Sequence, residues 1–201
     1  MTAHRVTGVV LAAGSSRRLG TPKQVLPYGD TTVLGATLDI ARRAGFDQLI
    51  VALGGAADAV RDAVPLDGAE VVVVSDESGA FGTGCSASLR VALQHVDPHA
   101  AGIVLMLGDQ PGMDPETLRR MRTAGPGSAV TVCRYADCIG HPFWFGRNMF
   151  DDLSQLHGDK GIWKLMESGR YPVCELPVDG PVPLDVDTWD DYRRLLESVP
   201  S

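Results

Sequence analysis

The chain has 201 residues, of which 44% are hydrophobic and 21% are charged, and its formal net charge at pH 7 is −7. A chain of this length and composition is expected to form one soluble globular domain over residues 1–201. The acidic balance disfavours nucleic acid or an anionic membrane as the main partner, and no stretch approaches the ~20 apolar residues of a membrane span. The four cysteines form no CxxC pair, so free thiols in a reducing cytoplasm are expected.

Continuous apolar runs in the first half of the chain predict parallel strands that are buried on both faces. These strands are expected at Val6–Leu11, Leu49–Leu53, Val71–Val74 and Ile103–Leu107. Amphipathic stretches with capping residues lie between the runs and predict helices. These helices are expected from Thr32 to Gly45, over Ala56–Val64, over Ser86–Val96 and from Asp114 onward. The alternation predicts an α/β fold with a mostly parallel sheet and helices on both faces.

After Gly127 the pattern of the sequence changes. Two strands joined by a turn are expected at Ala129–Tyr135 and His141–Phe145, which predicts a small antiparallel insertion. The remaining elements are expected to be helices at 148–156 and 161–168, a strand at 171–176 and a closing helix at 188–197.

The loop after the first strand combines small residues with positive charge. Its Ala12–Ser16 run lets backbone N–H groups approach phosphate oxygens closely, because little side chain stands in the way. Arg17, Arg18 and Lys23 follow and are able to neutralise a polyphosphate. The spacing matches neither a Walker A motif nor a dinucleotide fingerprint. The alternative to a phosphate-binding loop is an ordinary tight turn whose arginines are solvated.

Carboxylates follow the fourth predicted strand and precede the last predicted helix. Asp109 in MLGDQPGMD is expected at the carboxyl end of its strand, where it could hold Mg²⁺ between phosphates, since Asp114 already caps the next helix. Asp185 and Asp187 alternate in PLDVDTWDDY and so lie on one side of an extended segment. Asp187 is a second candidate metal ligand, and its alternative role is to cap the last helix.

Three further polar stretches are candidate binding segments. GTGCSASLR places Gly82, Gly84, Ser86 and Ser88 at a helix start, where they are suited to hydrogen-bond a base or a ribose. GHPFWF contains His141, for which packing within a turn is the alternative. HGDKG, at 157–161, places Asp159 and Lys160 between glycines, where a substrate anion could bind; those two residues complete the candidate set.

Five stretches in this order resemble the MobA-like nucleotidyltransferases, and most closely the molybdenum cofactor cytidylyltransferases. They are LAAGSSRRLGTPKQVLPYG, GDQP, GHPFWF, GDKG and LDVDT, and together they extend over nearly the whole chain. The resemblance implies a Rossmann-like nucleotide-diphospho-sugar transferase fold, a three-layer sandwich. It also implies transfer of CMP from CTP, favoured over GTP by LAAG, onto the phosphate of molybdopterin, with Mg²⁺ or Mn²⁺ and release of pyrophosphate. A molybdoenzyme that receives the product is a further implied partner.

The resemblance also implies roles for individual residues. The implied catalytic residues are Arg17, Lys23 and Asp109, and the implied metal ligands are Asp109 and Asp187. The residues implied to face the acceptor are His141, Asp159 and Lys160. The residues implied to bind the nucleotide are Leu11, Ala12, Ala13, Gly14, Ser15, Ser16, Arg17, Lys23, Gly84, Ser86 and Ser88.

The sequence departs from the family pattern at two places. Leu19 replaces the usual Met, and Ile162 and Trp163 follow GDKG where close relatives often carry a small residue and an arginine. The second departure leaves the acceptor open between molybdopterin and another phosphorylated small molecule. Transfer from another NTP such as GTP is an alternative. A catalytically idle nucleotide-binding or chaperone-like protein is another, although the presence of both Asp109 and Lys23 argues against it.

Overall fold

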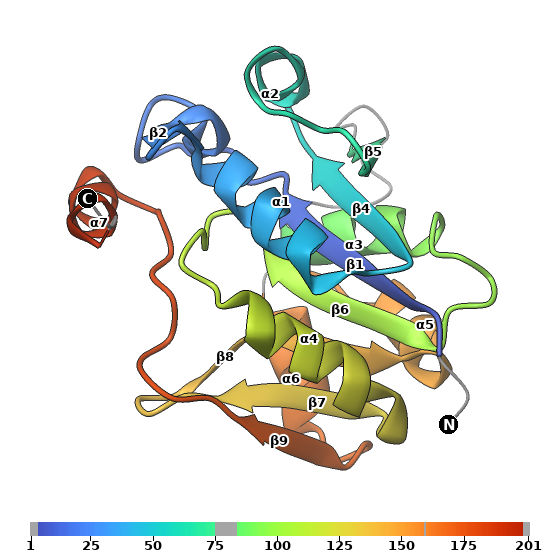
Figure 1. Cartoon of the computed structure of the whole chain (residues 1–201). Helices are drawn as coiled ribbons and strands as arrows, with labels where there is room; N and C mark the ends of the chain where they lie inside the picture. The colour runs from blue at the N-terminus through green and yellow to red at the C-terminus, as the bar shows by residue number, and fades with distance from the viewer. Residues whose placement is uncertain (1–3, 75–83, 159, 199–201) are drawn as a thin grey trace.

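The computed structural model describes residues 4–74, 84–158 and 160–198, and these residues form a main sheet of seven strands (Figure 1). In space the strands follow the order β5-β4-β1-β6-β8-β7-β9. Their bounds are β1 Val6–Ala12, β4 Gln48–Leu53, β5 Glu70–Val73, β6 Gly102–Leu107, β7 Val130–Arg134, β8 Ile139–Gly146 and β9 Val173–Pro177. Neighbours among β5, β4, β1 and β6 are parallel, as the continuous apolar runs predict.

Strand β8 runs against its two neighbours. It pairs antiparallel with β6 on one side and with β7 on the other, and β9 pairs parallel with β7. The predicted antiparallel insertion is therefore the β7–β8 hairpin, and β8 lies between β6 and β7. Because Leu105 of β6 faces Phe143 of β8, the beginning of β8 lies beside the carboxyl end of β6.

A second, two-stranded antiparallel sheet was not predicted. Its strands are β2 (Pro27–Tyr28) and β3 (Thr31–Thr32), and Gly29 turns between them with φ +59°. Strands of two residues are too short to produce a period-two pattern, so the sequence contains no signal for them.

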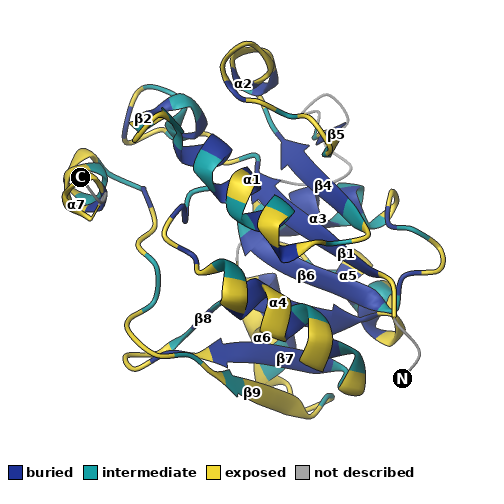
Figure 2. Ribbon diagram, viewed as in Figure 1, coloured by how far each residue is buried: buried dark blue, intermediate teal, exposed yellow. Residues whose placement is uncertain are grey.

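Helices cover both faces of the main sheet, which gives three layers. One face packs on α1 (Val33–Ala44), α2 (Ala57–Ala63) and α4 (Pro115–Ala124), and the other packs on α3 (Cys85–Leu93), α5 (Phe150–Ser154) and α6 (Gly161–Glu167). Successive strand residues alternate between the two cores: Val9 of β1 packs in the α3 layer and Val10 in the α1 layer. Figure 2 shows the central strands buried, whereas β9 is exposed at the sheet edge. The 3₁₀ helices are η1 Lys23–Val25, η3 Gly125–Gly127 and η4 Arg147–Met149.

The capping residues that were predicted from the sequence lie at the starts and ends of the helices, as expected. The Thr32 side chain accepts from the Gly35 N–H at 3.0 Å, and Gly45 ends α1 in a left-handed conformation with φ +72°. Asp114 accepts from the backbone of Glu116 and Thr117 at the start of α4. These local signals fix the helix ends, and therefore the loops that follow the strands.

The last helix, α7 (Trp189–Glu197), lies away from the main sheet at the end of an extended segment (Figure 1). Leu195 of α7 and Val186 of the extended segment are buried in a small third core with Leu19 and Leu26. The Tyr192 hydroxyl donates to the Pro27 carbonyl at 2.7 Å. This packing ties the extended segment to the loop after β1. No helix within the described ranges is long and apolar enough to cross a bilayer.

Candidate active site

A cavity of about 1070 Å³ opens at the carboxyl ends of β1, β4 and β6. The loop after β1 forms one wall, the start of α3 forms another, and residues 54–56 after β4 form a third. Asp109, Asp185 and Asp187 line the remaining side. Ligands of parallel α/β sheets bind at this edge, because strand ends and helix starts converge there.

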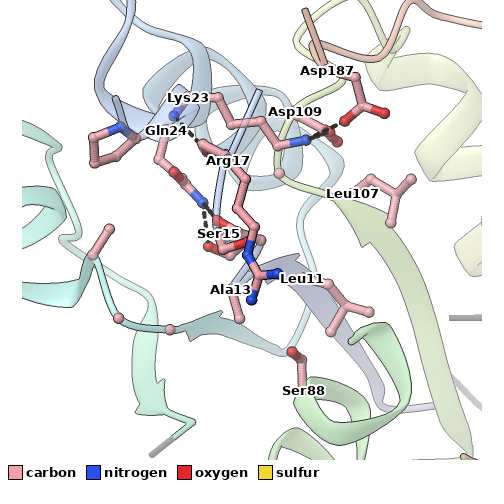
Figure 3. A pocket seen from close by; sticks show the side chains of 18 of the residues that line it. Leu11, Ala13, Ser15, Arg17, Lys23, Gln24, Ser88, Leu107, Asp109 and Asp187 are labelled. Carbon is pink, nitrogen blue, oxygen red and sulfur yellow. Dashed lines mark hydrogen bonds and ion pairs between the residues drawn. The ribbon is translucent and has the colours of Figure 1, made fainter. Parts of the chain in front are cut away.

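Most of the residues implied to bind a nucleotide line this cavity. They are Leu11, Ala12, Ala13, Gly14, Ser15, Ser16, Arg17, Lys23, Gly84 and Ser88. Arg17 reaches over the cavity toward Leu11 and Ala13, as Figure 3 shows. Within the described part of the chain, no hydrogen bond or ion pair holds the exposed Arg17 guanidinium, so it is available to an anion.

Gln24 holds the loop after β1 in shape, and the sequence reasoning missed this residue. Its Nε2 donates to the carbonyl of Ala12 at 2.7 Å and to that of Gly14 at 3.1 Å (Figure 3), and only 2% of the residue is exposed. Ser16 supports the same turn: its φ is +48°, and its Oγ accepts from the Lys23 N–H at 2.9 Å. With two of its carbonyls bound inward, this loop can direct N–H groups toward the cavity.

Lys23 lies between two of the carboxylates. Its Nζ donates to Oδ2 of Asp109 and lies 3.1 Å from Oδ1 of Asp187 (Figure 3). The lysine and Asp109 side chains are only 13% and 14% exposed. Burial alone lowers the pKa of Lys23, but the two carboxylates outweigh that effect and raise the pKa above its usual value. The lysine is therefore positively charged at neutral pH.

Asp187 receives a second cation from the loop after β1. Arg18 Nη2 lies 2.7 Å from its Oδ2. Partial burial raises the pKa of Asp187, but hydrogen bonds and charges from Lys23 and Arg18 lower it to below its usual range. The alternative in which Asp187 caps the last helix is wrong, because Thr188 is the N-cap and forms a capping box with Asp191.

Asp185 lies in the same cavity wall but has a different partner. Its Oδ1 accepts from Nε2 of Gln110, which also donates to the Pro183 carbonyl at 3.2 Å. Loss of solvation and the charge of Asp109 raise the pKa of Asp185 to about 6. Gln110 of the GDQP stretch is a second residue whose role was missed: it fastens the extended segment to the end of β6.

The carboxylates Asp109 and Asp187 are suited to a divalent cation. Both direct oxygens at one point, which the Lys23 ammonium occupies. Among the described residues no group of three or more His, Cys, Asp or Glu side chains could hold a metal alone. Mg²⁺ is commonly bound by one or two carboxylates together with substrate phosphates, so this donor set fits an ion that is shared with a nucleotide.

Two of the candidate residues lie around the GDKG loop, beside the cavity. Ser86 does not line the cavity: it is buried, and its hydroxyl donates to the Gly158 carbonyl, which ties the loop to the start of α3. Lys160 is exposed just before α6. Asp159, and Gly82 of the stretch before α3, lie outside the described residues.

His141 lies near the beginning of β8, two residues before the Phe143–Leu105 pair. It is half-buried, and its ring centroid is 4.1 Å from that of Phe143, which contacts Trp163 edge-on at 5.4 Å. Burial lowers the pKa of His141 to about 3, so its ring is neutral at physiological pH. His141 does not line the cavity, but the β6 residue nearest to it in register, Leu107, does.

Comparison with known proteins agrees with this geometry. The model of the MobA-like NTP transferase domain matches residues 8–173, and the chain belongs to this family of nucleotidyltransferases. The crystal structure of Rv0371c from Mycobacterium tuberculosis H37Rv is 70% identical and covers 98% of this chain and 100% of its own, with a TM-score of 0.92. A second structure of Rv0371c is a complex with manganese, 66% identical over 98% and 100% of the two chains, with a TM-score of 0.88.

Two more distant relatives cover nearly the same length. A nucleotidyl transferase from Methanothermobacter is 28% identical over 96% of both chains, with a TM-score of 0.77. Nicotine blue oxidoreductase from Paenarthrobacter nicotinovorans is 29% identical over 95% of this chain and 96% of its own. The predicted family, fold and enzyme class are thus confirmed.

Proposed function

We propose that this nucleotidyltransferase moves CMP from CTP onto the phosphate of molybdopterin, with Mg²⁺ or Mn²⁺ bound at Asp109 and Asp187. The observation that carries the proposal is one cavity with an anion-binding loop on one wall and paired carboxylates on the opposite wall. A triphosphate lying between these walls would meet backbone N–H groups and Arg17 on one side and the cation site on the other.

In the proposed reaction, a phosphate oxygen of the acceptor attacks the α-phosphorus of CTP, and the bond from that phosphorus to the leaving pyrophosphate breaks. Arg17 and Lys23 stabilise the negative charge that develops on the pyrophosphate. When bound, the divalent ion neutralises phosphate charge and favours in-line geometry. The acceptor phosphate is already anionic at neutral pH, so no protein nucleophile is needed.

The proposed preference for CTP rests on the LAAG stretch and on the part of the cavity that adjoins α3. Leu11, Ala13, Ala87, Ser88 and Leu107 all line this cavity. A Cβ added at Gly54 would lie only 2.6 Å from the carbonyl oxygen of Ala13. The backbone after β4 therefore packs closely against the loop after β1. A pyrimidine requires less room beside this wall than a purine does.

The proposed acceptor region is the side of the cavity next to β8 and α6. The neutral His141 ring lies on β8, the exposed Trp163 lies on α6, and Lys160 lies just before α6. An aromatic and basic surface suits a phosphorylated pterin, because a flat ring can stack while its phosphate pairs with a lysine. In this proposal the product then passes to a molybdoenzyme in the cytoplasm.

Nucleotide binding tests the proposal directly. Calorimetry with Mg²⁺ should show CTP binding more tightly than GTP, UTP or ATP, and a ligand at 100 times its Kd should add about 2.7 kcal/mol to the stability. Arg17→Gln should weaken CTP binding, whereas Arg61→Gln, at an exposed ion pair of α2, is the matched control. Tighter binding of GTP than of CTP would overturn the base preference, and no nucleotide binding would overturn the proposal.

A further inference from the structure

The ammonium group of Lys23 lies between the two carboxylates that are proposed to hold the divalent ion. Nζ donates to one oxygen of Asp109 and lies 3.1 Å from one oxygen of Asp187. The remaining oxygen of Asp187 is 2.7 Å from Arg18. A metal held by carboxylate oxygens lies at roughly 2.0–2.6 Å from them. A metal bound through Oδ2 of Asp109 and Oδ1 of Asp187 would need the oxygens that the ammonium contacts, and the like charges of the two cations oppose binding of both at this point.

The surroundings of Lys23 leave it a second place to go. Its Cε would lie 3.6 Å from a Cβ built on Gly14, so the lysine stem runs along the glycine loop. The four-carbon stem is flexible and ends in a compact charge. Because the stem passes beside Gly14, the 14–17 side of the cavity is within reach of that charge. That side is where the triphosphate is proposed to bind, so the displaced lysine would find new anionic partners there.

We propose that Lys23 is a placeholder for the divalent cation: it neutralises Asp109 and Asp187 until the metal binds, and it then moves to the nucleotide phosphates. This inference rests on the proposed function for the identity of the phosphates, but its first half requires only the contacts above. It assigns Lys23 two successive partners, carboxylates and then phosphates.

The exchange makes binding of metal and nucleotide mutually dependent. Metal alone must break two contacts of a lysine that is only 13% exposed, so it binds weakly. Nucleotide offers the lysine a new partner and the metal additional oxygen ligands, so each ligand strengthens the other by the same factor. Before the metal binds, the lysine reduces the repulsion between the neighbouring carboxylates of Asp109 and Asp187.

Manganese binding without nucleotide provides the test, because Mn²⁺ can be followed directly by electron paramagnetic resonance. Lys23→Met should bind Mn²⁺ about tenfold or more tightly than the unaltered protein, since the competing cation is gone. Lys23→Arg keeps the charge and should not gain affinity. Arg18→Met removes a more exposed partner of Asp187 and should gain less than Lys23→Met, and Arg134→Met, at the exposed Glu175 pair, is the control.

A second set of titrations adds CTP. In the unaltered protein CTP should tighten Mn²⁺ binding strongly, and in Lys23→Met the gain should be smaller. If Lys23→Met binds Mn²⁺ more tightly but CTP binds to neither protein, the placeholder role stands and the proposed function fails. Equal or weaker Mn²⁺ binding by Lys23→Met, or no measurable binding by either protein, overturns the inference. Should Lys23→Met be unfolded without metal, refolding on addition of Mn²⁺ supports the inference and failure to refold contradicts it.

Discussion

Gln24 is the residue whose importance depends most on tertiary structure. Its side-chain amide binds two carbonyls of the loop after β1, while its own Oε1 has no hydrogen-bond partner among the described residues. A buried glutamine inside a short 3₁₀ helix follows no hydrophobic period and belongs to no catalytic pattern. Only the folded turn reveals that it shapes the loop.

Gln24→Met should therefore reduce both stability and nucleotide affinity. The change leaves the buried Ala12 carbonyl and the partly buried Gly14 carbonyl without this donor and should lower the free energy of unfolding by about 2 kcal/mol. CTP should bind several-fold more weakly, because the loop loses its inner support. Urea denaturation and calorimetry measure the two effects, with Gln155→Met at an exposed position as the control. Unchanged CTP affinity in Gln24→Met would show that the loop keeps its shape without this amide.

His141 makes stability depend on pH. Its pKa is lowered to about 3 in the folded protein, whereas the unfolded chain takes up the proton near its ordinary value of about 6.5. Stability from this group is thus complete above pH 6.5 and is lost as the pH falls toward 3. Between pH 7 and pH 5, the unaltered protein should lose up to about 2 kcal/mol more than His141→Gln in urea unfolding. Identical pH dependence of the two proteins would mean that the His141 ring keeps its ordinary pKa in the folded protein.

At the scale of elements, the sequence predicts what is local and misses what is assembled from distant segments. Apolar runs and caps predicted the strands and the helix starts, including Asp114 and Thr32, because these signals act within a few residues. The expectation that Val71–Val74 is buried on both faces is wrong, because β5 is an edge strand in which only Val72 is buried. Two features could not be predicted, because no local sequence pattern encodes them. They are the position of β8 between β6 and β7 and the contact of Lys23 with Asp187, 164 residues away. The parallel-sheet rule nevertheless placed Asp109 at the correct end of its strand.

Helix α7 acts as an anchor for the segment that carries Asp185 and Asp187. Leu195 is 1% exposed in the small core beneath it, whereas its neighbour Leu196 is 40% exposed. Leu195→Ala should detach α7, because few other contacts hold this helix. The lost stability, about 2–4 kcal/mol, should appear as local unfolding of α7 rather than of the whole protein. Hydrogen exchange should rise in residues 184–198 and Mn²⁺ binding should weaken, while the main sheet stays protected.

Leu196→Ala is the matched control for this anchor and should change neither measurement. If Leu195→Ala keeps full Mn²⁺ affinity despite faster exchange in α7, the extended segment is positioned by Gln110 and Arg18 rather than by the helix.

On the scale of the whole molecule, an acidic protein with net charge −7 places three of its 18 lysine and arginine side chains around one cavity. Arg17, Arg18 and Lys23 line one cavity, and the carboxylates opposite them hold two of the three in place. These three cations and the carboxylates of Asp109, Asp185 and Asp187 nearly balance in charge within the cavity lining. The fold thus brings the loop after β1 and the carboxylates of Asp109 and Asp187 to the same cavity, as a nucleotidyltransferase requires.

The most direct test of the central claim is a transfer assay with α-labelled CTP, Mg²⁺ and molybdopterin, comparing the unaltered protein with Asp109→Asn. The account predicts labelled CMP on the acceptor and a rate lower by on the order of 100-fold in Asp109→Asn, without loss of fold. Asp151→Asn, at an exposed position of α5, is the control and should keep the full rate. An unchanged rate in Asp109→Asn, or no transfer of label from CTP to molybdopterin by the unaltered protein, would contradict the account.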